Sequence, residues 1–216
     1  LGLSKRLDEA GLQLLIGDTD YRREREEALV HAFLSRKPEA IVLTPDGHTP
    51  RTLRLLADAG VPVIEIWEEP EEPVQHVVGF SNRQAMRGLV ENLARSGYRR
   101  ITFVGESDDE GTRGAARRAG YRDALEALGL GPPRICALGR PPVTMSNGAQ
   151  ALDLVLERFP DTDLVVCVSD PLAFGMASAC RRRGISVPDE LAIAGFGDFE
   201  ISRIAAPSLT TTGVDA

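Results

Sequence analysis

Residues 164–196 read LVVCVSDPLAFGMASACRRRGISVPDELAIAGF, and this stretch decides the fold. Its two apolar runs, at 164–169 and 191–196, lack the polar alternation of a half-exposed strand, which is typical of strands buried on both faces of a parallel sheet. Between them Asp170 stands as the N-cap of a helix, a proline follows it, and Gly184 ends the helical pattern. A strand, a helix and a strand in this order predict a βαβ unit.

The same alternation extends outward over the chain. Six more apolar runs are predicted as strands, at residues 12–17, 40–44, 61–67, 76–79, 101–105 and 134–138. Helical spacing predicts helices at residues 22–36, 51–59, 82–96, 113–128 and 147–158, besides 171–183. This order predicts an α/β fold with doubly wound parallel sheets.

The eight predicted strands fall into two similar sets, which predicts two α/β lobes. We expect the lobes at residues 1–97 and 98–206, with 207–216 returning to the first lobe. A ligand would then bind in the cleft between the lobes, at the carboxyl ends of the strands. One large doubly wound sheet is the alternative.

Composition limits the class of protein. The chain has 216 residues, of which 43% are hydrophobic and 26% charged, as in globular proteins, and its net charge is −7. An acidic chain lacks the surplus of lysine and arginine that general nucleic-acid binding requires. The three cysteines, Cys136, Cys167 and Cys180, are expected as buried free thiols rather than redox or metal groups. Without a signal peptide or an apolar run of about 20 residues, the expected location is the cytoplasm.

Motifs for catalysis are missing from the sequence. It contains no phosphate-binding loop, no nucleophile elbow and no cysteine or histidine spacing for a metal, and residues 195–197 lack the third glycine of a dinucleotide motif. We therefore expect no enzyme, no cofactor and no metal site. The acidic run at 68–72 is expected to be a solvated loop, and the arginines at 181–183 to complement a helix C-terminus.

Two arginines provide the strongest local signal for binding. Arg113 and Arg117 are four residues apart near the start of a predicted helix, so both project from one face. Two guanidinium groups beside a helix N-terminus suit a carboxylate or phosphate. Ion pairs with the acidic residues at 108–110 are an equally good interpretation.

Ordered phrases over most of the chain resemble the effector-binding core of LacI/GalR-type transcription regulators, and most of all their gluconate-type branch. They are residues 79–82 (GFSN), 93–101 (LARSGYRRI), 117–125 (RRAGYRDAL), 169–175 (SDPLAFG), 184–196 (GISVPDELAIAGF) and 207–212 (PSLTTT). The resemblance implies a type I periplasmic-binding-protein-like fold and a small-molecule effector, a sugar or sugar acid. A secreted sugar-binding protein of a transporter, which shares this fold, is the alternative.

The resemblance also implies partners. Family members carry an N-terminal helix-turn-helix upstream of the position of Leu1, so operator DNA would be bound by that module and not by these residues. Members also act as homodimers, for which the helix at 51–59, with Leu53 and Leu56, offers candidate contacts. No membrane partner is expected.

Ligand contacts carry over residue by residue. In the family, the position of Arg117 grips ligand hydroxyls or carboxylates, Arg113 replaces a small polar contact one turn earlier, and Ser169 replaces a frequent asparagine. Gln84 matches a cleft-lining position, and Val143 stands where many members place a stacking aromatic residue. Asn82 is a further candidate, although Asn82 and Asp170 are each favoured as helix caps.

Charge indicates the class of ligand. Gly197 stands where many members place an aspartate that binds neutral sugars, and only the neighbouring Asp198 could replace it. The site thus loses a negative group and gains a positive one, Arg113. A buried aspartate would repel a carboxylate, whereas two guanidinium groups bind one. We therefore expect a sugar acid such as gluconate rather than a neutral hexose or pentose.

Overall fold

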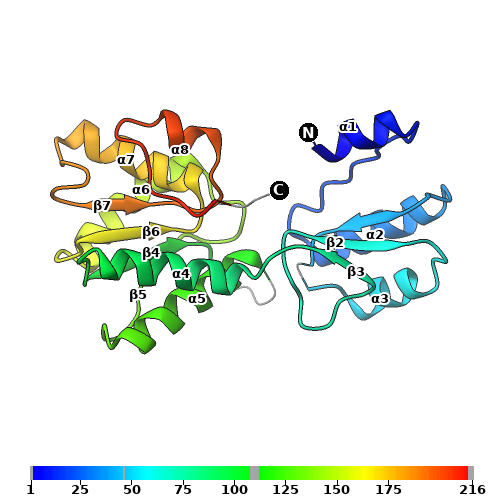
Figure 1. Ribbon diagram of the computed structural model, residues 1–216, viewed down its shortest axis with the longest axis horizontal. Helices are drawn as coiled ribbons and strands as arrows, with labels where there is room; N and C mark the ends of the chain where they lie inside the picture. Colours follow the sequence, from blue (N-terminus) through cyan, green and yellow to red (C-terminus); the bar gives the residue numbers. More distant parts are fainter. Residues whose placement is uncertain (1, 46, 108–111, 214–216) are drawn as a thin grey trace.

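The computed structural model describes residues 2–45, 47–107 and 112–213, and these residues form two α/β lobes (Figure 1). In the first lobe, β1 (Ile41–Leu43), β2 (Val63–Ile66) and β3 (His76–Val78) form a parallel sheet in that order. The second lobe holds a four-stranded parallel sheet in the order β5-β4-β6-β7. Its strands are β4 (Ile101–Gly105), β5 (Arg134–Ala137), β6 (Leu164–Cys167) and β7 (Ala192–Ala194). The two-lobe fold is confirmed, and the single large sheet is wrong.

Helices cover both faces of the second sheet (Figure 1). They are α4 (Asn82–Arg95), α5 (Arg113–Leu128), α6 (Met145–Arg158), α7 (Asp170–Arg183) and the short α8 (Glu200–Ile204). Gly129 and Gly184 end α5 and α7 in the left-handed conformation that glycine adopts readily, and the end at Gly184 is the one that the sequence predicts. The buried strand residues and the inner faces of the helices form one core.

The lobe boundary lies earlier than residue 97. Helix α4 was expected in the first lobe, but Met86, Leu89, Val90 and Leu93 join the core of the second lobe. The chain therefore crosses between lobes at residues 79–81, between β3 and α4 (Figure 1). Apolar spacing shows that a helix has a buried face, but it does not show which sheet that face covers.

The first lobe is smaller and contains α1 (Gly2–Glu9), α2 (Arg23–Leu34) and α3 (Pro50–Ala57). Residues 12–17, predicted as a strand, are not one: no strand among the described residues pairs with them, and Leu15 and Ile16 are exposed. A strand exists through its ladder of hydrogen bonds, so apolar residues alone do not form it. Within α3, Leu53 is exposed but Leu56 is fully buried, so Leu56 offers no dimer contact.

The last segment also differs from expectation. Residues 207–213 follow the second lobe: Thr210 bridges Ala194 of β7, and its carbonyl accepts a hydrogen bond from Gly195 N–H. Leu209 is buried in the same core. The expected return to the first lobe is therefore wrong over 207–213, while residues 214–216 lie outside the described residues.

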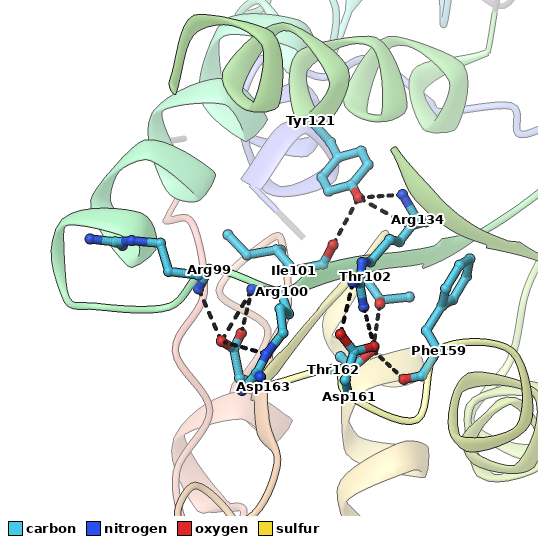
Figure 2. A network of polar contacts seen from close by, with 10 residues as sticks. All are labelled: Arg99, Arg100, Ile101, Thr102, Tyr121, Arg134, Phe159, Asp161, Thr162 and Asp163. Atoms are coloured by element: carbon cyan, nitrogen blue, oxygen red, sulfur yellow. Dashed lines mark hydrogen bonds and ion pairs between the residues drawn. The ribbon is translucent and has the colours of Figure 1, made fainter. Parts of the chain in front are cut away.

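Polar contacts hold the amino ends of the second lobe's strands (Figure 2). The Asp163 carboxylate accepts hydrogen bonds from the backbone N–H groups of Arg99 and Arg100, just before β4. Tyr121 donates to Ile101 O and accepts from Arg134 N–H, which joins α5 to β4 and β5. Burial raises the pKa of Tyr121 to about 12, so its hydroxyl stays protonated. Structural hydrogen bonds thus occupy the polar groups at the amino ends of the strands, so the carboxyl ends are the better candidate for a binding site.

Helices α4 and α5 pack through a glycine. A Cβ atom on Gly120 would lie 2.0 Å from the backbone oxygen of Arg83, closer than any side chain is tolerated. Gly88, on α4, has nothing within 4 Å of the same added atom. The two glycines therefore form a matched pair.

Gly120→Ala is expected to lower the free energy of unfolding by about 1–3 kcal/mol, because the two helix backbones must move apart. The control Gly88→Ala should leave it unchanged or raise it by up to about 1 kcal/mol, since alanine is the better helix former. Urea denaturation measures both. Equal stability of the two variants would show that the α4–α5 contact is looser than described.

A buried ionic trio supports the first lobe. His48 Nδ1 lies 2.7 Å from Glu26 Oε1, and its Nε2 lies 3.3 Å from Glu65 Oε1, with all three side chains at most 10% exposed. Carboxylates only accept hydrogen bonds, so both ring nitrogens must carry a proton and the ring is an imidazolium. Burial opposes this charge, but the hydrogen bonds and attraction of Glu26 and Glu65 outweigh it and raise the pKa of His48.

A raised pKa makes stability depend on pH. The imidazolium's contribution is complete below about pH 6.5, the unfolded pKa, and is lost as the pH rises through the folded pKa. We expect the free energy of unfolding to fall as the pH rises above about 6.5, the pKa of unfolded histidine, and to fall much less in His48→Gln. Burial raises the pKa of Cys180 to about 11 and also raises that of Cys136, so these thiols add a loss of stability of their own above about pH 8.5, where unfolded thiols ionise, and the comparison is made below about pH 8. The same pH slope in the variant would refute this role for His48.

Candidate functional site

Arg117 lies at the centre of the site. Thr112 caps α5 by accepting from Ala115 N–H, so the helix begins at Arg113 and Arg117 follows one turn later. Arg117 Nε donates to Asn82 Oδ1 at 2.7 Å, and its Nη1 donates to Val168 O at 2.8 Å. The guanidinium carbon lies 4.0 Å above the centre of the Phe196 ring. Three different elements thus fix one cation.

The surroundings make Arg117 an unusual arginine. Burial, and next the charge of Arg113, lower the pKa of Arg117 to about 10, although Glu106, Glu68 and Tyr21 act in the opposite direction. It remains charged at neutral pH, in a partly buried setting that favours the arrival of negative charge. Tyr21 and Glu68 belong to the first lobe and Glu106 to the second, so both lobes contribute to the field at Arg117.

The sheets explain why these groups meet. Val168 follows β6, Phe196 follows β7, Glu106 follows β4 and Glu68 follows β2. All the strands are parallel, so their carboxyl ends share one edge of each sheet. That edge is where open α/β sheets bind ligands. The side chains lie at the strand ends where the sequence places the cleft, and a ligand at this position stays a prediction.

Arg113 is the second cation of the site. It is the first residue of α5, is partly buried, and is close enough to Arg117 to lower the pKa of Arg117. The Glu106 carboxylate lies against the same turn, because a Cβ atom on Gly114 would lie 1.5 Å from Glu106 Oε2. The acidic residues at 108–110, the alternative ion-pair partners, lie outside the described residues.

Asn82 is fully buried and bonded on three sides. Its backbone N–H donates to Glu68 Oε1 at 3.2 Å, its Nδ2 donates to Trp67 O at 2.8 Å, and its Oδ1 accepts from Arg117. Trp67 and Glu68 follow β2, so Asn82 joins the first lobe to the arginine of the second. Ser81, not Asn82, caps α4 by accepting from Gln84 N–H.

The other predicted contacts spread around this centre. Ser169 is partly exposed and is the N-cap residue of α7, next to the Val168 carbonyl that Arg117 binds. Val143 is partly buried and packs against the core of the second lobe. Gln84 is exposed and lines a different hollow with Ser81, Arg83, Arg87 and Asp123. For these three residues a role in binding stays a prediction.

Two carboxylates at the end of the second lobe have structural partners. Asp198 pairs with Arg203, whose guanidinium lowers the pKa of that carboxyl group. Asp170 is fully buried, and its carboxylate accepts hydrogen bonds from Phe199 N–H and Thr211 Oγ1. Asp170 therefore ties the start of α7 to the final segment. The N-cap of α7 is Ser169 and not Asp170, which the sequence had predicted for this position.

Sequence reasoning missed Glu68 and Glu106. The run at 68–72 was expected to be wholly solvated, which holds for Glu69, Glu71 and Glu72 but not for the half-buried Glu68. Glu68 and Glu106 each follow closely on a strand, at the carboxyl ends where the sequence analysis expects a ligand. Because Glu68 stands in a run of glutamates, its position after a strand was interpreted as part of a solvated loop.

Other sequence predictions can be compared with the described residues. The three cysteines are buried and free, as predicted. In the described part of the chain, no group of three or more histidine, cysteine, aspartate or glutamate residues is arranged to hold a metal. No described helix has the length and apolar character needed to cross a membrane.

Known proteins are similar to this chain in sequence and in fold. Residues 90–216 match the family described as periplasmic binding protein-like domain. Two HTH-type transcriptional regulators of Escherichia coli K12 are similar to the chain: GntR is 31% identical over 210 residues and IdnR 35% identical over 211. Each match covers 97% of the chain, which spans 62% of the length of these relatives.

A solved structure is closer still. The crystal structure of a LacI family transcriptional regulator from Silicibacter pomeroyi superposes with a TM-score of 0.95 at 48% identity, covering 99% of this chain and 79% of that one. The named relatives are regulators rather than enzymes or transport proteins, and GntR and IdnR fit the gluconate-type branch expected from the sequence.

Proposed function

The chain belongs to the LacI family of transcriptional regulators, with their periplasmic binding protein-like domain, and we propose that it is an effector-binding core whose ligand is a sugar acid of the gluconate type. The effector binds at the strand ends around Arg117, between the lobes, and changes the angle between them. That angle controls DNA binding by a helix-turn-helix that lies outside these 216 residues.

The observation that carries this proposal is the pair of guanidinium groups on α5. Arg117 is held by Asn82 through Nε, by the Val168 carbonyl through Nη1 and by the face of the Phe196 ring, and these three contacts use neither hydrogen of its Nη2. A carboxylate bridging Arg113 and Arg117 gains charge-assisted hydrogen bonds and relieves the repulsion between the two cations.

Two carboxylates near Arg117 are suited to bind the hydroxyl groups of a sugar acid. Glu68 and Glu106 lie close enough to Arg117 to influence its pKa. Carboxylates accept hydrogen bonds from hydroxyl groups and repel other anions. A ligand with one acid group and several hydroxyls therefore fits this set of four side chains better than a dicarboxylate or a neutral sugar.

Assembly and location follow from the same proposal. We expect a homodimer, because a dimer reads two DNA half-sites, and the exposed Leu53 on α3 remains a candidate contact. A regulator of transcription acts at DNA, so its location is the cytoplasm. The chain alone should bind effector but no operator, since its acidic surface carries no DNA-reading module.

Calorimetry with gluconate and glucose tests the proposed ligand. Gluconate should bind more tightly than glucose, and Arg117→Ala and Arg113→Ser should each weaken gluconate binding about 10- to 100-fold through the loss of charge-assisted hydrogen bonds. The control is Arg87→Ser, which removes an exposed arginine that pairs with Glu91 on α4 and should leave binding unchanged.

Three results would reject this ligand class: tighter or equal binding of glucose, no loss in either arginine variant, or a loss in Arg87→Ser as large as in the other two. Thermal unfolding of each variant without ligand checks that its fold is intact.

A further inference from the structure

Asn82 was a candidate contact for the effector, but its surroundings assign it another task. Its side chain is fully buried, and both ends of its carboxamide are engaged by protein groups: Oδ1 by Arg117 Nε and Nδ2 by Trp67 O. Arg117 is the cation that we propose binds the effector, whereas Trp67 belongs to the first lobe. One side chain thus contacts both the proposed effector-binding group and the opposite lobe.

The first lobe holds Asn82 tightly. Trp67 has a left-handed backbone, with φ of 73°, which a bulky residue adopts only where its surroundings enforce it. Its N–H donates to Val78 O and its carbonyl accepts from Asn82. Gly79 packs closely against Glu68, the residue that follows Trp67: a Cβ atom on Gly79 would lie 2.2 Å from Glu68 O. The crossover from β3 to α4 is therefore packed against Trp67 and Glu68.

Glu68 adds a second bond from the first lobe to the start of α4. Its Oε1 accepts from Asn82 N–H, while its Oε2 is buried and has no hydrogen-bond partner among the described residues. A buried carboxylate oxygen without a donor is unfavourable, so this contact is not fully satisfied at the lobe angle described. A change of angle that supplies a donor would be favoured.

We propose that Asn82 is a positioning residue that couples the effector to the lobe angle. Its Oδ1 aims the guanidinium of Arg117 at the effector's carboxylate, and its Nδ2 ties that guanidinium to Trp67 of the first lobe. The coupling to effector rests on the function proposed above. A guanidinium binds a carboxylate through two parallel hydrogen bonds only when its plane is fixed, so the same amide that positions the cation also transmits its displacement.

Asparagine chemistry allows the two tasks to be separated. In Asn82→Asp, the carboxylate can still accept from Arg117 Nε, but it cannot donate to Trp67 O and instead repels that carbonyl. In Asn82→Ala, both bonds are lost. Asn92→Ala is the matched control, because Asn92 is an exposed asparagine on the same helix.

The experiment measures the distance between the lobes with spin labels. The labels are attached at Ala57→Cys on α3 and Ala127→Cys on α5, which are exposed, while the three native cysteines are buried and unreactive. Without ligand, the distance distribution should be narrow in the parent and in Asn92→Ala, and clearly broader in both Asn82 variants. Distributions as narrow in Asn82→Asp and Asn82→Ala as in the parent would overturn the coupling.

Gluconate then provides the second comparison. At saturation it should shift the mean distance in the parent and in Asn92→Ala but not in Asn82→Asp, and Asn82→Ala should bind gluconate at least about tenfold more weakly. A full shift in Asn82→Asp would overturn the inference. If the parent does not bind gluconate, the proposed ligand fails, while the ligand-free distributions still decide the role of Asn82. If Asn82→Ala does not fold, Asn82→Ser takes its place.

Discussion

The structure depends most on how one buried cation is held. Arg117 places a positive charge in a partly buried position, where the hydrogen bonds that water would make to the guanidinium must be replaced by protein groups. The replacement is supplied by an amide oxygen from α4, a backbone carbonyl at the end of β6 and the face of Phe196 after β7. These groups come together only if α4, α5 and the carboxyl edge of the sheet are in place, so the position of the charge depends on how these parts of the second lobe pack.

The two lobes support this site unequally. The second has a large continuous core and helices that pack at glycines, with Gly120 against α4 and Gly148 against α7. The first has a small core around Val30, Leu56 and Val63, beside the ionic trio of His48. A lobe with little apolar burial opens and shifts more easily than one with a full core. We therefore expect the second lobe to hold the two arginines that bind the ligand in place, and the first lobe to move relative to it.

Much of this could be predicted from the sequence, because local patterns carry it. The spacing of Arg113 and Arg117 sets a common helical face wherever the helix lies, and Gly184 ends α7 for reasons within its own turn. Three features could not be predicted that way. The lobe that α4 joins is decided by which sheet its apolar face meets, residues 12–17 form no strand without a paired neighbour, and Glu68 is distinguished from the glutamates beside it only by tertiary contacts.

A crystal structure of the chain with gluconate would show whether the two arginines of α5 hold the effector. We expect the carboxylate at about 2.7–2.9 Å from guanidinium nitrogens of Arg113 and Arg117, with Asn82 still bonded to Trp67 and Arg117 and not to the ligand. A gluconate carboxylate bound away from both arginines, or an Asn82 amide turned to the ligand, would contradict it.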